Sequence, residues 1–346
     1  MDNLIEKNRE NGYWIYNIPC ILVTRKGTVL VAYECRHGGD WSVSDIALRR
    51  SLDGGKTFQE RQLVVSGGGR HTVHGCMLFE KNGALYMLWN EDYHRAYSAK
   101  SFDEGTTWSA PQDISYVYES LRERYPWQVI CQGPGHALVT RSGRVIAGVW
   151  LANNLGDRNK HYPSVMASIY SDDGEHWQAG EIICGNERFL NPSENVIAQC
   201  SDGSFYLNFR QSSENRYRAV ARSRSGIGDW SAFSYDQALP DPECAAGLCT
   251  ANGLLVFSNC AADKRERDPR RNLTVRISRD DGHCWSCGYL VNEWGGYSDV
   301  AFDDVRKNVI VVYNGGRRDD ATDWWHYAGI RVAVIPIKEL QNGNEQ

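Results

Sequence analysis

Three arginines stand at the ends of apolar runs that have the composition of β-strands. Arg36 closes the run 31–36, Arg210 closes the run 206–210, and Arg270 precedes the run 272–278. Guanidinium groups at successive strand ends can converge on one anion, because their planar forks bind a carboxylate through two hydrogen bonds. A single arginine of this kind more commonly forms a surface salt bridge. Only the three arginines taken together therefore favour an anion site.

Two further segments carry groups that could react. Glu194 stands sixteen residues before Arg210, at the start of the same expected hairpin, and Tyr297 follows a pair of glycines. A phenol can act as a nucleophile when a neighbouring carboxylate takes its proton. Taken alone, a tyrosine is more often a packed aromatic and a glutamate in this setting a turn residue, so this chemistry also depends on the fold that positions the groups.

A short repeated motif, SxDxGxTW, predicts that fold. Copies lie at 51–58, 101–108, 172–177 and 278–285, with the aspartates taken at 53, 103, 172 and 280, and the segment 223–230 resembles a copy that has lost its aspartate. Repeats at a period of about fifty residues are typical of a solenoid or propeller. Each aspartate can accept hydrogen bonds from the backbone of its own turn, while the glycine supplies a positive φ and the aromatic residue anchors the loop. We therefore expect a structural role for these boxes.

Six apolar runs between the boxes read as strands, because they are rich in β-branched and aromatic residues and bounded by Gly, Asp and Asn. They lie at 28–33, 85–89, 144–150, 204–209, 253–257 and 308–313. They predict an all-β, six-bladed β-propeller with four-stranded antiparallel blades. We expect a single domain over 1–346, with an N-terminal extension at 1–12 and a C-terminal tail at 340–346. The one helix we predict spans 118–124.

Composition and motifs exclude several classes of function. The net charge is −5 without a basic run, which argues against a nucleic-acid partner. We find no signal peptide and no stretch long enough to span a membrane. Eleven scattered cysteines without CxxC pairs indicate neither a disulfide framework nor a zinc site. We therefore expect a cytoplasmic protein with no membrane association, no cofactor and no metal, and leave its oligomeric state open.

The ordered set of strand-end residues resembles the sialidase (neuraminidase) superfamily, whose members begin with a YRIP or FRIP motif. The matching segments are 16–19, 32–36, 48–55, 133–136 with 142–144, 193–194, 207–210, 270–273, 297–299 and 312–313. They occur in family order from residue 13 to about 335. The resemblance implies a retaining exo-glycosidase that removes a terminal acidic sugar, with tyrosine in place of the usual carboxylate nucleophile.

By this resemblance, Tyr297 is the nucleophile, Glu194 its base and Asp40 the general acid/base, with Asp45 as a competing acid. As the acid, Asp40 would need a pKa raised by partial burial or by a nearby anion such as the substrate carboxylate. The residues implied for substrate binding are Arg210 and Arg270 at the carboxylate, Arg36 near the ring hydroxyls, and His74, Trp150 and His136 elsewhere in the pocket. Arg271 is an unsuitable substitute for Arg270, because the family arginine lies three residues before the position of Leu273.

Asn17 departs from the family pattern, which has an arginine of the carboxylate clamp at this position. An amide can donate a hydrogen bond but supplies no formal charge, so affinity for a carboxylate should fall by about 1–3 kcal/mol. Three explanations stay open: another arginine, such as Arg317 or Arg318, reaches in; the substrate is a different ulosonic, uronic or neutral sugar; or the protein binds glycans without cleaving them.

Overall fold

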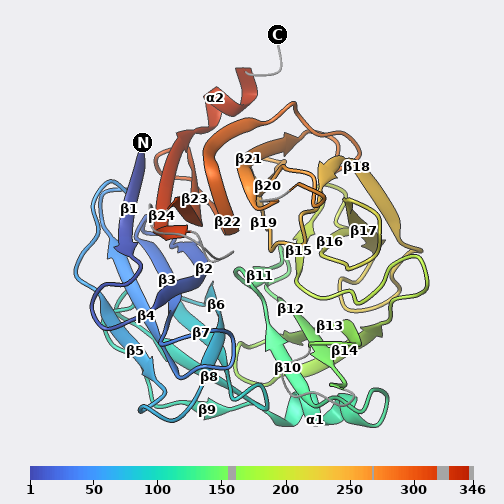
Figure 1. Ribbon diagram of the computed structural model, residues 1–346, viewed down its shortest axis with the longest axis horizontal. Coiled ribbons are helices and arrows are strands. Elements are labelled where there is room, and N and C mark those ends of the chain that lie inside the picture. Colours follow the sequence, from blue (N-terminus) through green and yellow to red (C-terminus); the bar gives the residue numbers. More distant parts are fainter. Residues whose placement is uncertain (155–160, 267–268, 318–326, 343–346) are drawn as a thin grey trace.

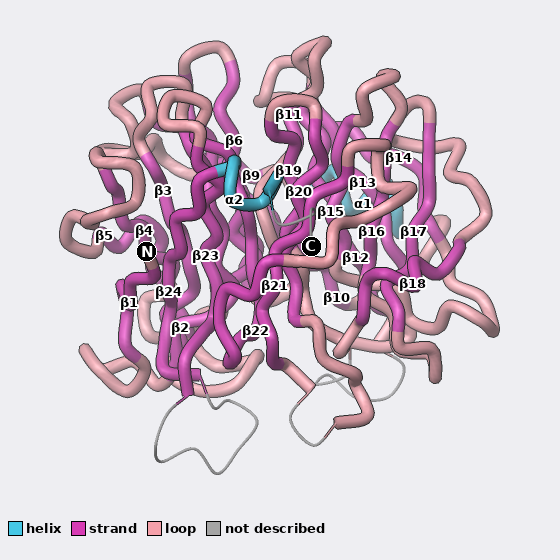
Figure 2. The backbone as a smooth tube through the Cα atoms, turned by 90° about the horizontal axis from the view of Figure 1, so that it is seen from above, coloured by secondary structure: helices cyan, strands magenta, loops and turns pink. Residues whose placement is uncertain are grey.

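The structure is a computed structural model that describes residues 1–154, 161–266, 269–317 and 327–342. Nearly all of the regular structure is antiparallel strand, arranged as sheets around a common centre (Figure 1). In the perpendicular view the strands run roughly along one direction, with loops gathered at both ends (Figure 2). The expectation of an all-β, propeller-like architecture is therefore confirmed.

Four sheets of four or five strands stand apart from one another. The first contains β2 (Ile15–Val23), β3 (Val29–Arg36), β4 (Ser44–Ser51) and β5 (Gln62–Ser66). The second contains β6 (Val73–Lys81), β7 (Ala84–Glu91), β8 (Arg95–Ser101) and β9 (Gln112–Asp113). The third contains β10 (Val129–Gln132), β11 (Leu138–Val139), β12 (Val145–Ala152), β13 (Ser164–Ser171) and β14 (Gln178–Ile183). The fourth contains β15 (Asn195–Gln199), β16 (Phe205–Phe209), β17 (Tyr217–Ser223) and β18 (Ser234–Pro240).

The remaining seven strands form one sheet, so the prediction of six separate blades is wrong. In spatial order they are β1 (Asp2–Lys7), β24 (Tyr327–Pro336), β23 (Asn308–Arg317), β22 (Tyr289–Asp303), β21 (Arg271–Ser278), β20 (Leu254–Cys260) and β19 (Gly247–Ala251). The reason is the length of β22, whose first half pairs with β21 and whose second half pairs with β23. The segment 1–12, which we expected to be an extension, contains β1, and β1 pairs with β24.

All six predicted apolar runs are strands: they coincide with β3, β7, β12, β16, β20 and β23. Each is almost entirely buried, in keeping with strands packed between neighbouring sheets. Within the described ranges two helices accompany the strands, and neither has the length and apolar character of a membrane span. α1 (Tyr116–Arg122) overlaps the predicted helix, whereas α2 (Ile337–Asn342) was not predicted.

The boxes connect the third strand to the fourth in each repeat. At 51–58, for example, the Asp53 carboxylate accepts hydrogen bonds from the backbone N–H groups of Lys56 and Thr57 and from the hydroxyl of Ser51. At 171–177 the corresponding group is Asp173, not Asp172 as we expected, because the turn there is one residue shorter. Asp172 instead pairs with Arg144.

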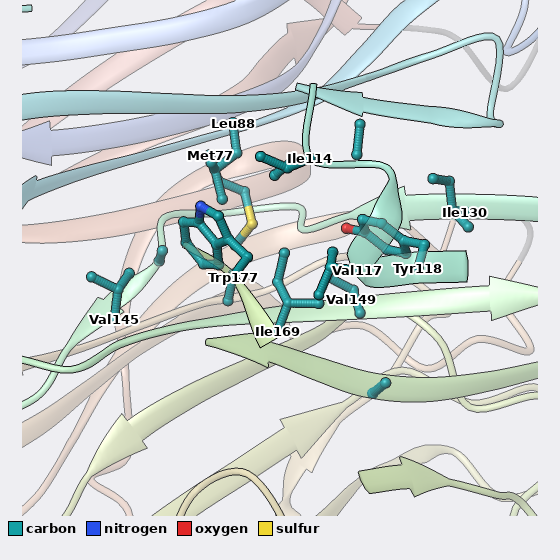
Figure 3. Close-up of a cluster of buried hydrophobic side chains, with 14 of the residues drawn as sticks. Met77, Leu88, Ile114, Val117, Tyr118, Ile130, Val145, Val149, Ile169 and Trp177 are labelled. Atoms are coloured by element: carbon teal, nitrogen blue, oxygen red, sulfur yellow. The ribbon is translucent and has the colours of Figure 1, made fainter. Parts of the chain in front are cut away.

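Apolar side chains fill the spaces between adjacent sheets. The largest such cluster packs the second sheet and α1 against the third sheet, and Figure 3 shows Val117 and Tyr118 of α1 beside Val149 of β12. Burial of side chains of this size stabilises the fold by about 1.5–3 kcal/mol for each one. The packed sheets therefore form a rigid frame, and their strand ends lie at fixed positions.

Antiparallel pairing brings the start of one strand beside the end of the next. Residue 194 directly precedes β15 and residue 210 directly follows β16, and the backbone N–H of Arg210 donates to the carbonyl of Glu194. In the first sheet, Ile15 and Asn17 near the start of β2 lie opposite Arg36 and Glu34 at the end of β3. The residues expected to react thus lie at one end of the sheets.

Candidate active site

A cavity of about 250 Å³ opens at this end of the sheets. His136 does not line it, but nine other residues that we expected in the site do: Asn17, Arg36, Asp40, His74, Trp150, Glu194, Arg210, Arg270 and Tyr297. None of the box residues lines it. The strand-end residues are therefore brought together, and the boxes are left with their expected structural role.

Tyr297 and Glu194 are in direct contact. The Tyr297 hydroxyl donates a hydrogen bond to Glu194 Oε1. Arg210 Nη1 lies 2.9 Å from Glu194 Oε2 and 2.9 Å from the Tyr297 hydroxyl oxygen, so one guanidinium nitrogen donates to both groups. Tyr297 occupies a register break of β22 between Gly295 and Ser298, which turns its side chain into the cavity.

The surroundings of Tyr297 keep its hydroxyl protonated. Burial raises the pKa of Tyr297 and the negative charge of Glu194 raises it further, against the opposing effect of Arg210 and Arg270, so that the pKa lies well above its usual range. A phenol in this state is a weak nucleophile until a base removes its proton. Glu194 is the carboxylate placed to do so.

Asp40 lies in the loop between β3 and β4 and also lines the cavity. Its Oδ1 is 2.6 Å from Arg36 Nη1, and its backbone carbonyl accepts a hydrogen bond from the Tyr93 hydroxyl. The Asp40 side chain is 40% exposed, whereas the Arg36 side chain is 4% exposed. A buried cation therefore faces a carboxylate at the mouth of the cavity.

The pKa of Asp40 departs from our expectation. Burial raises this pKa, but the charge of Arg36 and its hydrogen bond outweigh burial, and the result is a pKa below the usual range. We expected a raised pKa, as a resting general acid requires. The direction is the opposite, because Arg36 and Asp40 pair more closely than the sequence revealed.

Arg270 lies beside the nucleophile candidate. Its guanidinium carbon is 5.1 Å from the centre of the Tyr297 ring, and Nη2 donates to the backbone carbonyl of Glu243 at 2.9 Å. Arg210 and Arg270 thus both flank Tyr297 within the cavity. Two guanidinium groups in this position can bind the carboxylate of a ligand at the reacting centre.

His74 and Trp150 form part of an aromatic wall. The His74 ring stacks on Tyr93 with a centroid distance of 3.7 Å, and its Nε2 accepts a hydrogen bond from the Tyr93 backbone N–H. Burial, together with the charge of Arg36, lowers the pKa of His74 well below its usual range, so the imidazole is neutral. Trp150 is 5.1 Å from His161 between ring centroids. This wall offers apolar contact rather than charge.

The alternative residues lie elsewhere. Asp45 does not line the cavity, and its carboxylate accepts hydrogen bonds from Tyr13 and from the backbone of Gly67. The exposed Arg317 packs on Trp294, with 4.7 Å between its guanidinium carbon and the ring centroid. Arg271 pairs with Glu293. Arg318 lies outside the described residues.

His136 was expected in the pocket but lies at a second cavity. Its Nδ1 is 3.0 Å from Oδ1 of the buried Asp299, and Asp299 also accepts a hydrogen bond from the backbone of Ile21. Pro134, two residues earlier, lines the candidate active site. The segment between them therefore separates the two cavities, and the direction of each side chain could not be read from the sequence.

Several lining residues were not predicted. Glu34, Tyr93 and His161 line the cavity, and Glu34 is only 1% exposed. Glu34 carried a usable signal, since it is a charged residue inside an otherwise apolar strand. Tyr93 and His161 lie in loops without any pattern that marks them. Two groups of possible metal ligands in the described residues, at 71, 91 and 92 and at 200, 202 and 281, lie outside the cavity.

Comparison with known proteins gives consistent matches. The family model for the BNR repeat-like domain matches residues 69–300. A sialidase from Micromonospora viridifaciens is 28% identical over 315 residues, covering 80% of this chain and 46% of the relative. A sialidase from Bacteroides fragilis is 27% identical over 346 residues, covering 86% of this chain and 59% of the relative. The chain thus spans about half the length of these curated relatives.

Among solved structures, the Hadza microbial sialidase Hz136 superimposes with a TM-score of 0.78 at 21% identity. The match covers 98% of this chain and 69% of the other. At this identity the likeness establishes the fold.

Proposed function

We propose that this chain, which belongs to the BNR repeat-like domain family and to the sialidase superfamily, is a retaining exo-glycosidase that removes a terminal acidic sugar. The observation that carries the proposal is the placement of the Tyr297 hydroxyl between the Glu194 carboxylate and the Arg210 guanidinium. A protein that only binds glycans has no need of a buried phenol paired with a base.

In the first step, the Tyr297 oxygen attacks the anomeric carbon while Glu194 takes the phenol proton. The bond from the anomeric carbon to the leaving oxygen breaks, and Asp40 gives that oxygen a proton. The product is a covalent glycosyl–tyrosine and a free aglycone. A phenol that loses its proton during attack approaches an anionic substrate nearly neutral, so it avoids the repulsion that a carboxylate nucleophile would meet.

In the second step, a water molecule attacks the anomeric carbon and Asp40 accepts its proton. The bond to the Tyr297 oxygen breaks, and Glu194 returns the proton to the phenolate. Two displacements at the same carbon leave its configuration unchanged. Arg210 stabilises the negative charge as it moves between Glu194 and Tyr297, because it donates to both.

Asp40 must acquire its proton when the substrate binds. Arg36 lowers the pKa of this carboxylate below its usual range and so favours its ionised form. Arg270 also lowers this pKa, and a substrate carboxylate bound at Arg270 offsets that charge, while the sugar excludes water from an Asp40 side chain that is 40% exposed. Both changes raise the pKa of Asp40.

Two measurements test this function. Proton NMR of the hydrolysis of an aryl sialoside should show the retained anomer as the first product. A fluorinated sialosyl fluoride that forms the intermediate quickly and releases it slowly should add one sugar to the peptide containing Tyr297, as detected by mass spectrometry. An inverted first product, or a label on another residue, would contradict the mechanism.

A further inference from the structure

Asn17 and Glu34 form a polar pair at one wall of the cavity. They are directly opposite each other in the pairing of β2 with β3, and cross-strand partners project to the same face of a sheet. Both line the cavity, with 3% and 1% of their surfaces exposed. This wall therefore carries an amide and a carboxylate, and the neighbouring cation, Arg36, is paired with Glu34 and Asp40.

Glu34 has hydrogen-bonding capacity left over. Its Oε1 accepts the backbone N–H of Gly75 at 2.9 Å, and its Oε2 accepts two nitrogens of Arg36 at 2.6 Å each. A carboxylate has about four acceptor positions, so about one remains. The side chain of Asn17 has no hydrogen bond to any described residue, although it is almost fully buried. The wall thus presents one amide and one spare acceptor position to a ligand.

The backbone beside Asn17 is strained. Ile18 has φ of +49°, which is unfavourable for a β-branched residue, and the register of β2 breaks between Asn17 and Cys20. Ile18 also lines the cavity. Strain of this kind is typical of functional sites. The strained backbone of β2 therefore holds residue 17 at the wall at some loss of stability.

The charges of the described lining residues balance. Three carboxylates, of Glu34, Asp40 and Glu194, face three guanidinium groups, of Arg36, Arg210 and Arg270. Arg36 lies between two of the carboxylates, whereas Arg210 and Arg270 lie beside Tyr297. Two carboxylates offset the charge of Arg36, whereas Arg210 pairs with the single carboxylate of Glu194 and Arg270 lies next to Tyr297. A ligand carboxylate is therefore attracted to Arg210 and Arg270 more than to Arg36.

We propose that Asn17 and Glu34 determine specificity by binding a hydroxyl group of the sugar, while Arg210 and Arg270 alone hold its carboxylate. The preferred substrate is then an acidic sugar that presents a hydroxyl at this wall, and a sugar that places its carboxylate there is disfavoured. This inference rests on the proposed function, since it concerns the same cavity.

The test is a charge series at residue 17, measured on aryl glycosides of ulosonic, uronic and neutral sugars. Asn17→Ala should raise KM for the best substrate of the wild type by about five- to tenfold, the effect of one lost hydrogen bond, with kcat little changed. Asn17→Arg should lower kcat/KM for that substrate and raise it for a sugar with its carboxylate at this wall. Asn17→Asp should weaken binding of every carboxylate-bearing substrate. Thermal unfolding of each variant checks that it folds.

Two outcomes would overturn the inference. One is an unchanged KM in Asn17→Ala, since the side chain then does not touch the sugar. The other is a higher kcat/KM of Asn17→Arg for the best substrate itself, since the wall then binds its carboxylate. Tyr297→Phe separates this failure from that of the proposed function. If Tyr297→Phe is inactive and the variants at residue 17 have the wild-type KM, only the role of Asn17 and Glu34 is refuted. If Tyr297→Phe is fully active, or if the wild type cleaves none of the substrates, both that role and the proposed function are refuted.

Discussion

Substitution of Tyr297 by phenylalanine separates its chemical role from its structural role. The change removes the hydroxyl that donates to Glu194 and accepts from Arg210, while the ring beneath Arg270 stays in place. Arg210 and Glu194 still bond to each other at 2.9 Å, so neither buried charge loses all of its partners.

The two effects should differ greatly in size. The variant loses the hydrogen bonds of the Tyr297 hydroxyl to Glu194 and Arg210, but the ion pair between these two residues remains. The free energy of unfolding should therefore fall by about 1–3 kcal/mol. Loss of the nucleophile should lower kcat by about a thousandfold or more, which corresponds to about 4 kcal/mol in the activation barrier. The predicted variant is therefore folded and nearly inactive.

The assay is release of the aryl group under saturating substrate, alongside thermal unfolding of the same samples. Tyr313→Phe is the control, because Tyr313 is a fully buried tyrosine of the same seven-stranded sheet and does not line the cavity. The control should keep its full kcat. A Tyr297→Phe variant that retains more than about a tenth of the wild-type kcat would refute the reasoning, since so small a barrier change is below that expected for a lost nucleophile.

Three further predictions concern the acid, a buried ion pair and a box. Asp40→Asn should lower kcat/KM far more for substrates with sugar leaving groups than for those with nitrophenol leaving groups, because only the former need a proton from Asp40. Equal losses in kcat/KM would exclude Asp40 as the acid. Arg218→Ala should lower the free energy of unfolding by about 3–5 kcal/mol in thermal melts, because it leaves the buried Asp241 carboxylate without its cation. The double variant Arg218→Met with Asp241→Asn should lose less stability, since it removes both charges. Equal losses of stability in the two variants would contradict the idea that the unpaired carboxylate is the cause. The hydrogen bond from Thr107 lowers the pKa of Asp103 to about 2, below an unfolded value of about 3.9. Above about pH 4 the wild type should therefore have a higher urea midpoint of unfolding than Asp103→Asn, and the difference should disappear as the pH falls towards 2. A difference that does not change with pH would show that the hydrogen bonds of Asp103 do not depend on the charge of its carboxylate.

The strands could be predicted from the sequence because each carries its own signal. The runs at 28–33 and 308–313, for example, are apolar, β-branched and bounded by turn residues, and they form the buried centres of β3 and β23. The sheet count could not be predicted in the same way. β22 could have ended between its pairing with β21 and its pairing with β23, which would have given two separate sheets. Whether it does so depends on contacts between strands, and no local residue pattern determines it.

The site divides along the same line. Residues at strand ends, such as Arg36 and Arg210, could be assigned because their position in the strand gives their position in space. Glu34 was missed although it lies two residues from Arg36, since only the cross-strand view places it opposite Asn17. The pKa of Asp40 was likewise beyond the sequence, because its direction depends on a distance of 2.6 Å to Arg36.

The length of β22 also affects how the molecule can come apart. Sheets that contact each other only through side chains can separate locally. β22, however, pairs with β21 along its first half and with β23 along its second half, so hydrogen bonds join all seven strands from β19 to β1. This sheet therefore joins the two ends of the chain and should be among the last parts of the ring to open. Because Tyr297 lies in β22, its position should persist when other sheets open locally.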